Sequence, residues 1–389
     1  MRLFWQEMRK IWRPGILAAL VVVGVLFYFL RPKFWIERIS ETQSFDHSLM
    51  LVDRYGPVLT AGVRPELDSM YDEIVADFDR ELKNIPEAVE AGITDLESYL
   101  AAERDGSLYE IDRRAYTELW QLFMTVNDFG IITGRYDSHI DGTFGLRNSP
   151  HLAGYTPQAQ ARIIELEEAE VRTGTISFMD HFVPEYTADW GRYLTVWSVL
   201  SVILLLSPTL VRDRLRRTNA MQWTSRRGRR VVRTQTAAAL ASSLLLAAVN
   251  LALYFIPFAQ QGSLPLWDCP IYCGSGGMPW FDWTYGQFIL MLIGMHFLFA
   301  LAAGGLAVFL SQFSSNYVPM LLKAVPLFLT VGLAVANWAL SDPFFIRKSH
   351  YGGADNPKGI ELACALLLLA VSLGSCVWTC IRQKNQELI

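Results

Sequence analysis

Charged residues are scarce in this chain of 389 residues. They make up 19% of the sequence, whereas hydrophobic residues make up 52%. Soluble globular domains carry about 25% charged residues. The deficit comes from apolar runs of at least about 18 residues, which are long enough to cross a bilayer as helices. This composition excludes an ordinary soluble protein and predicts a membrane protein.

Recognisable catalytic motifs are also lacking. The sequence has no GxxxxGK[ST] phosphate loop, no HExxH zinc motif and no GxSxG nucleophile turn. We therefore expect this chain to hydrolyse no ATP, to contain no catalytic residue, and to bind no cofactor, metal or nucleic acid by itself.

Six apolar runs predict the fold class, an all-α polytopic membrane protein with six transmembrane helices plus a mainly helical extracellular domain. Helices are expected because the backbone must satisfy its hydrogen bonds internally within lipid. The first run follows basic residues, as a secretory signal would, but no small-residue cleavage site follows it, so we expect a retained span. The predicted spans are residues 14–31 and 192–211, and four more within 235–381, namely 235–258, 285–311, 317–340 and 360–381.

The distribution of basic residues predicts the orientation, because short loops rich in Lys and Arg stay in the cytoplasm. Residues 1–13 contain four basic residues, the loop 212–234 contains nine arginines, and the tail 382–389 contains two. The outer loop 259–284 contains none, and the other outer loop is 341–359. We therefore expect a multi-pass protein of the cell membrane, in a bacterial plasma membrane, with both termini cytoplasmic.

Residues 32–191 then form the extracellular domain, which carries 30 of the 38 acidic residues and 13 of the 34 basic ones. Apolar periodicity and capping signals predict helices at 65–84, 94–104, 110–128 and 156–174, separated by an irregular stretch at 129–155. In that stretch Asp137, His139 and Asp141 alternate, so an extended backbone would point all three to one side, as metal ligands are arranged. We favour the alternative, a polar loop without a metal.

The cytoplasmic loop 212–234 carries an ordered pattern. Asp213 begins it, Thr224 and Ser225 follow eleven and twelve positions later, and Gly228-Arg229 precedes the next span. This pattern resembles the loop of ABC transporter permease subunits of the type-2 exporter class, which have a large extracellular domain after the first transmembrane helix. Departures from the family pattern include Asp213 in place of glutamate, and glutamine in place of a common lysine at position 235.

The resemblance implies that the loop forms a coupling helix in a groove of a separate ATPase subunit, which binds ATP and magnesium. It also implies export through a pair of permeases, as a homodimer or a heterodimer. The amphipathic residues 1–13 would form an interfacial helix on the inner leaflet. The residues expected to contact the ATPase subunit are Asp213, Thr224, Ser225, Arg226, Arg227, Gly228, Arg229 and Arg230.

The arginines also have explanations outside the family. Arginine forks bind carboxylates of a partner bidentately, and Asp213 can pair with neighbouring arginines. The alternatives are retention of the loop in the cytoplasm and attraction to anionic membrane lipid. We favour docking of a partner, because lipid attraction requires no ordered spacing of Thr, Ser, Gly and Arg.

Other features leave alternatives open. Cys269 and Cys273 lie in an outer loop, where a disulfide between them is permitted. The mid-span residues Asn250 and His296 either line a path or, as we favour, form interhelical hydrogen bonds. Two other functions remain: a non-transporting membrane sensor or scaffold with an extracellular ligand-binding domain, and a membrane enzyme that uses Asp180, His181 and Glu185. The exported substrate is not indicated.

Overall fold

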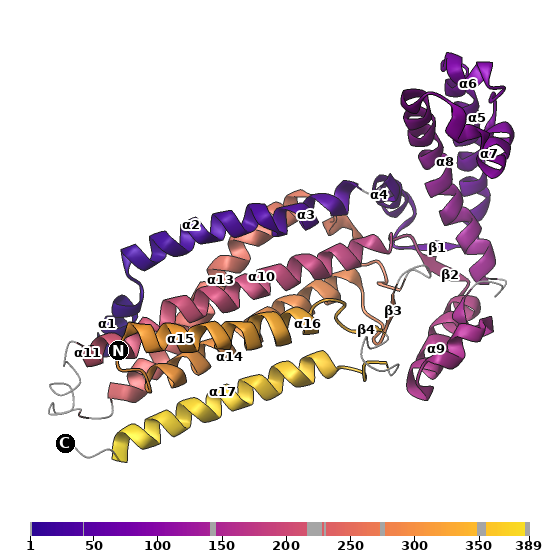
Figure 1. Cartoon of the computed structure of the whole chain (residues 1–389). Coiled ribbons are helices and arrows are strands. Elements are labelled where there is room, and N and C mark those ends of the chain that lie inside the picture. The colour runs from indigo at the N-terminus through magenta and orange to yellow at the C-terminus, as the bar shows by residue number, and fades with distance from the viewer. Residues whose placement is uncertain are drawn as a thin grey trace.

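The computed structural model is a long helical bundle with a separate group of helices at one end (Figure 1). It describes residues 2–41, 43–140, 145–215, 228, 231–272, 277–347 and 355–385. Within these residues six helices are long and apolar enough to cross a membrane, which confirms the all-α polytopic fold class. The six are Pro14–Glu41, Phe182–Asp213, Val231–Gln260, Tyr285–Ser311, Tyr317–Ala339 and Ile360–Arg382.

The first span is longer than the predicted range 14–31. It consists of α2 (Pro14–Leu30) and α3 (Pro32–Glu41), with a break at Arg31. Both helices begin at proline, whose missing N–H is not needed in the first turn. Only 6% of the apolar part of this span is buried in the protein, so α2 lies at the edge of the bundle.

The second span begins ten residues earlier than predicted, so the range 192–211 was wrong at its start. It consists of α10 (Phe182–Leu206) and α11 (Pro208–Leu215). Arg192 lies within α10, where its Nη2 atom is 2.5 Å from Asp189 Oδ1, one helical turn earlier. The two charged side chains therefore pair with each other within the helix.

The third, fourth and fifth spans pack on α10, and the last span packs mainly on the fourth. They are α13 (Val231–Gln260), α14 (Tyr285–Ser311), α15 (Tyr317–Phe328) continued by the π-helix η6 (Leu329–Ala336) and by α16 (Asn337–Ala339), and α17 (Ile360–Asn385). Gly304 of α14 faces the Ser243 hydroxyl of α13, and Gly305 faces Ser372 of α17. The absence of a Cβ at these two glycines lets three helices approach closely.

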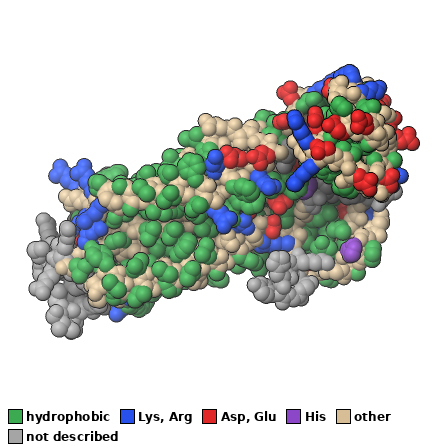
Figure 2. Space-filling model, turned by 45° about the horizontal axis from the view of Figure 1, so that its top comes forward, with side chains coloured by type: hydrophobic (Ala, Val, Ile, Leu, Met, Phe, Trp, Pro, Cys, Tyr) green, Lys and Arg blue, Asp and Glu red, His purple; other side chains and the backbone are tan. Residues whose placement is uncertain are grey.

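The group of helices at the end of the bundle is called the helical domain here, residues 43–177 (Figure 1). Figure 2 shows acidic side chains gathered on it, whereas hydrophobic side chains cover the visible face of the bundle. Its elements are α4 (Gln43–Tyr55), β1 (Val58–Thr60), α5 (Arg64–Leu82), α6 (Pro86–Glu90), α7 (Leu96–Asp105), η1 (Ser107–Glu110), α8 (Arg113–Ile140), η2 (Leu146–Asn148), η3 (Pro150–Gly154), α9 (Pro157–Thr173) and β2 (Thr175–Ser177).

The helices expected in this domain are present. The prediction for α9 is confirmed at both ends, since Thr156 caps it and Gly174 adopts a left-handed conformation with φ 63°. The helix α7 is capped by Asp95 and Ser98, so its cap lies one residue after the predicted start at residue 94. Strand β1 pairs antiparallel with β2, so Val58 lies opposite Ser177 and the start and end of the domain are joined.

The irregular stretch predicted at 129–155 was partly wrong, because α8 continues to Ile140. Asp137 and His139 therefore lie on a helix, where positions two apart are separated by about 200° around the axis. Asp137 accepts a hydrogen bond from Arg64 Nε at 2.9 Å, and Asp141 lies outside the described residues. In the described part of the chain, no group of His, Cys, Asp and Glu is arranged to hold a metal ion.

Loops between the spans hold the helical domain against the bundle. They contain η5 (Leu264–Leu266) and the strands β3 (Met278–Pro279) and β4 (Phe345–Ile346), which pair antiparallel. Arg162 of α9 lies over this region, with Nη2 2.5 Å from Asp282 Oδ1 and Nε donating to Pro279 O at 3.2 Å. Apolar residues of α9 and Trp280 form one buried cluster beneath it.

Candidate functional site

The N-terminal segment forms a helix, α1 (Arg2–Ile11), at the end of the bundle opposite the helical domain (Figure 1). We call this end the terminal end. Met8 and Ile11 are buried against the bundle. Trp12 donates from Nε1 to Ser242 Oγ of α13 at 3.1 Å, and Arg212 of α11 donates from Nη1 to Lys10 O at 2.9 Å. The amphipathic helix is therefore fixed to two other helices of the bundle.

A buried carboxylate lies where these helices meet. Asp213, at 6% exposure, accepts a hydrogen bond from Gln235 Nε2 of α13 at 2.9 Å. Lys10 Nζ lies 3.8 Å from the same Oδ2 atom and 2.7 Å from Glu7 Oε1. We call these four residues the Asp213 network, and it connects α1, α11 and α13.

Lys10, far away in the sequence, supplies one cation near the Asp213 carboxylate. Neighbouring arginines were also expected to pair with Asp213, and the side chains of Arg214, Arg216 and Arg217 lie outside the part of the chain that the structure describes. At position 235 the resembled family commonly has lysine. Here Gln235 donates a hydrogen bond to Asp213 from an uncharged amide. One signal was available in the sequence: Gln235 is a polar residue at the start of an otherwise apolar span.

The rest of the predicted contact set is described only in part. Gly228 adopts a left-handed conformation with φ 49°, which a residue without a Cβ tolerates and which suits the turn expected there. The other predicted loop residues lie outside the described residues, namely Thr224, Ser225, Arg226, Arg227, Arg229 and Arg230.

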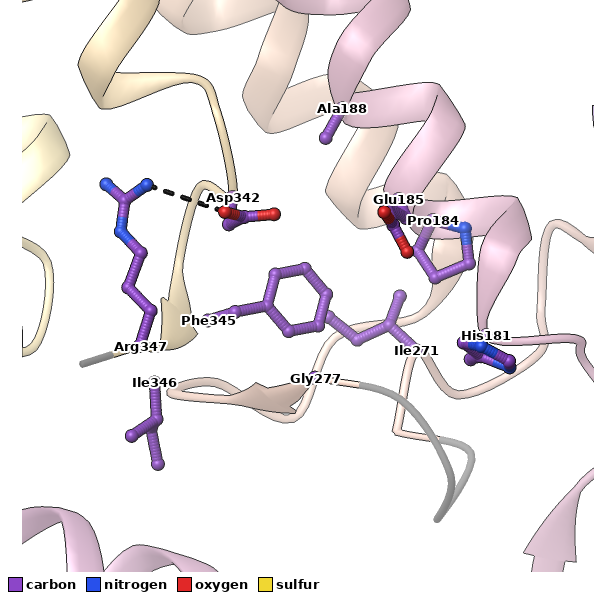
Figure 3. Close-up of a pocket in the computed structure, with 10 residues that line it drawn as sticks. All are labelled: His181, Pro184, Glu185, Ala188, Ile271, Gly277, Asp342, Phe345, Ile346 and Arg347. Atoms are coloured by element: carbon purple, nitrogen blue, oxygen red, sulfur yellow. Dashed lines mark ion pairs between the residues drawn. The ribbon is translucent and has the colours of Figure 1, made fainter. Parts of the chain in front are cut away.

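A pocket of about 210 Å³ lies at the other end of α10, next to the helical domain (Figure 3). Glu185 of α10 and Asp342 lie on opposite sides of it, and the Phe345 ring lies between and below them in this view. Arg347 Nη1 is 3.8 Å from Asp342 Oδ2, while Arg347 Nη2 is 3.8 Å from the buried Glu361. We call this cavity the α10 pocket.

The α10 pocket brings together the residues of the enzyme hypothesis. His181 lines it, and His181 Nδ1 lies 3.3 Å from Asp180 Oδ1. Asp180 also accepts a hydrogen bond from Phe182 N at 2.8 Å, which fixes its carboxylate at the start of α10. The lining residues within the described part of the chain include no Ser, Thr or Cys, and they supply charged groups and an aromatic ring.

The remaining candidates have structural roles. Asn250 donates from Nδ2 to Ser198 Oγ and Ser201 Oγ, both at 3.0 Å, and His296 Nε2 lies 3.1 Å from Ala247 O. Both residues form interhelical hydrogen bonds, as the preferred interpretation predicted.

Cys269 is a buried free thiol, and burial raises its pKa to about 12. Its expected disulfide partner, Cys273, lies outside the described residues. The structure therefore gives no support to a disulfide at Cys269.

In comparisons with known proteins, no family model, no curated protein and no solved structure matches the chain.

Proposed function

We propose that this chain is the membrane-spanning permease subunit of an ABC exporter. In this proposal the terminal end faces the cytoplasm, the helical domain lies outside the cell membrane, and a separate ATPase subunit docks on the loop 212–234. A second permease, identical or different, completes the transporter. The order of residues in the loop and the layout of six spans around a large inserted domain support the proposal.

The observation that carries the proposal is the Asp213 network. A coupling loop must transfer a displacement from a soluble subunit to helices in the membrane. Gln235 connects Asp213 to α13, and Arg212 and Lys10 connect α11 to α1. A displacement of the loop at Asp213 therefore acts on three helices, and a bundle that is closely packed moves by discrete shifts rather than by continuous deformation.

The second span can carry such a displacement to the other end of the bundle. At about 1.5 Å per residue, the 25 residues of α10 extend over roughly 38 Å. The helix runs from Ser207, next to α11, to the α10 pocket beside the helical domain. We propose that ATP-driven closure of the partner tilts this helix and changes the α10 pocket and the contacts of α9.

The test is purification of the tagged chain from its native membranes, with ATP hydrolysis measured and a P-loop ATPase identified by mass spectrometry. Replacing Arg226, Arg227, Arg229 and Arg230 with Gln is expected to leave membrane insertion normal and to abolish ATPase association. A control with the same number of changes replaces four exposed arginines of the helical domain, namely Arg80, Arg104, Arg113 and Arg172. Intact association of the loop variant, or labelling of the loop from outside the cell, would contradict the proposal.

The second candidate is a sensor or scaffold without transport. It is favoured by the α10 pocket, which is lined by α10 and by loops between the spans, on a helix that reaches the terminal end. The two candidates differ in the behaviour of the partner. An exporter raises the ATP turnover of the subunit that co-purifies with it, whereas a scaffold leaves an associated protein without such turnover.

A further inference from the structure

A long groove runs along the first span, within the part of the chain that crosses the membrane. Its volume is about 460 Å³. One wall is α2, from Leu17 to Phe29, the other is α13, with Val249 and Leu253, and Trp197 of α10 lies at its base. The groove is separate from both the Asp213 network and the α10 pocket.

The length and volume of the groove indicate what kind of molecule can bind in it. Leu17 to Phe29 covers twelve helical steps, or about 18 Å, roughly three-fifths of the hydrocarbon thickness of about 30 Å. Spread over this length, a volume of about 460 Å³ leaves room for a chain of methylene groups. A helix with its side chains is about 10–12 Å wide, so a helix of a second copy would lie across the mouth of the groove. A single hydrocarbon chain, whose carbon atoms make contact at about 4 Å, fits inside it.

The chemistry of the lining points the same way. No charged side chain lines the groove, and most of its polar groups form hydrogen bonds within the protein. Asn250 donates to Ser201 Oγ at 3.0 Å, and the Tyr254 hydroxyl donates to Gly24 O at 3.2 Å. A polar ligand would find few free partners there, whereas a methylene chain needs none.

The residues on the α2 wall face outward as well as into the groove. Val21 and Val25 are 63% and 50% exposed, so the groove is open to the surrounding lipid along its length. At the end nearer the helical domain, Lys33 Nζ lies 5.7 Å from the centre of the Phe29 ring. Lys33 pairs with Glu37 at 3.3 Å, and both side chains are about half exposed. An exposed ion pair of this kind contributes little to the free energy of folding. A phosphate can therefore replace Glu37 as the partner of Lys33.

We propose that this groove binds one acyl chain of a membrane phospholipid, with the phosphate at the Lys33 end. The lipid fills the space between α2 and α13 and supplies the apolar contacts that α2 lacks elsewhere. This inference does not depend on export, because a sensor with the same first span would bind the same lipid.

The test uses the full chain in nanodiscs that contain phosphatidylglycerol with a diazirine on its acyl chain. After illumination, mass spectrometry is expected to find adducts on peptides from α2 and α13. Val25→Trp fills the groove and should lower this labelling roughly tenfold, the loss that corresponds to about two methylene groups no longer buried. Val22→Trp is the matched control: Val22 is 60% exposed on the same helix but does not line the groove, so labelling should be unchanged.

Val249→Trp fills the groove from the α13 side and should repeat the loss if Val25→Trp destabilises the chain. Equal labelling of the wild type and both groove variants would overturn the proposal. It would also be overturned if Val25→Cys formed disulfide-linked dimers while the groove peptides carried no lipid, because a second copy would then cover the groove.

Discussion

Gln235 Nε2 lies 2.9 Å from Asp213 Oδ2, and this hydrogen bond joins α11 and α13, the two helices on either side of the arginine-rich loop. Both side chains are buried, at 5% and 6% exposure. The loop therefore begins and ends at points that are bonded to each other. Its two ends move together, and a protein that displaces one end also displaces the other.

Removal of the Asp213 carboxylate should destabilise the terminal end. Asp213→Ala leaves the Gln235 amide buried without this acceptor, which costs about 1–3 kcal/mol. Asp213→Asn keeps an acceptor for Gln235 and loses only the charge near Lys10, so it should be milder. Thermal unfolding in detergent is expected to rank wild type above Asp213→Asn and Asp213→Asn above Asp213→Ala. If Asp213→Ala were as stable as the wild type, the hydrogen bond between Gln235 and Asp213 would contribute nothing to the stability of the fold.

A methyl group at Gly304 should disrupt the contact between α13 and α14. A Cβ there would collide with Ser243 Oγ, and overpacking of this kind costs about 1–3 kcal/mol. Gly294, on the same helix, has no atom within 4 Å of the Cβ position. Gly294→Ala should therefore be neutral or slightly stabilising, because alanine favours helix. The melting temperatures of the two variants provide the comparison, and equal values would refute this packing.

Loss of Arg162 should release α9 from the loops of the bundle. The Arg162 side chain is 9% exposed and bonds Asp282 and Pro279 O, and hydrogen bonds to charged groups contribute about 1.5–3 kcal/mol. Arg162→Met keeps the apolar part of the side chain and removes these bonds. Hydrogen exchange is expected to become faster in α9, while Arg172→Met, an exposed change on the same helix, should have no effect. Unchanged exchange in both variants would argue against docking through Arg162.

A buried carboxyl in α8 should make stability depend on pH. Burial, with the nearby Asp180 carboxylate, raises the pKa of Asp128 from the ordinary 3.8 to about 6. Between pH 3.8 and about 6 the folded state therefore holds a proton that the unfolded state has lost, so the free energy of unfolding falls as the pH rises from about 4 to 6. Above pH 6 the whole cost of ionising this buried carboxyl is present, and it lowers the free energy of unfolding by up to about 3 kcal/mol.

Asp128→Asn cannot ionise and should be more stable than the wild type at pH 7–8 but equal to it near pH 4. Melting curves recorded across this pH range provide the measurement, and Asp72→Asn, an exposed change on α5, is the control. A constant difference between Asp128→Asn and the wild type at every pH would mean that ionisation is not the cause.

Most of the fold could be predicted from the sequence, because lipid imposes a simple requirement on composition. Apolar runs long enough to cross the hydrocarbon became helices in all six cases. The helix ends of α9 were predictable because Thr156, Pro157 and Gly174 act through their own backbone geometry. Local chemistry of this kind needs no knowledge of what packs nearby.

Features that depend on distant partners could not be predicted in this way. The predicted range 192–211 begins at the charged residue Arg192, whereas α10 begins ten residues earlier and Arg192 pairs with Asp189 inside it. One cation near Asp213 is Lys10, and nothing in the local sequence connects the two. The stretch with Asp137 and His139 was expected to be irregular, but α8 continues to Ile140, and Phe129, Ile132 and Tyr136 of this part of the helix pack into a buried apolar cluster.

The short ribbon formed by β1 and β2 has a consequence for how the chain is built. Because Thr60 lies opposite Thr175, the polypeptide leaves and returns at neighbouring points. Residues 61–174 are thus an insertion in a single turn of an otherwise ordinary polytopic topology. Such a unit can be lengthened, shortened or exchanged during evolution without a change in the order of the membrane-spanning helices.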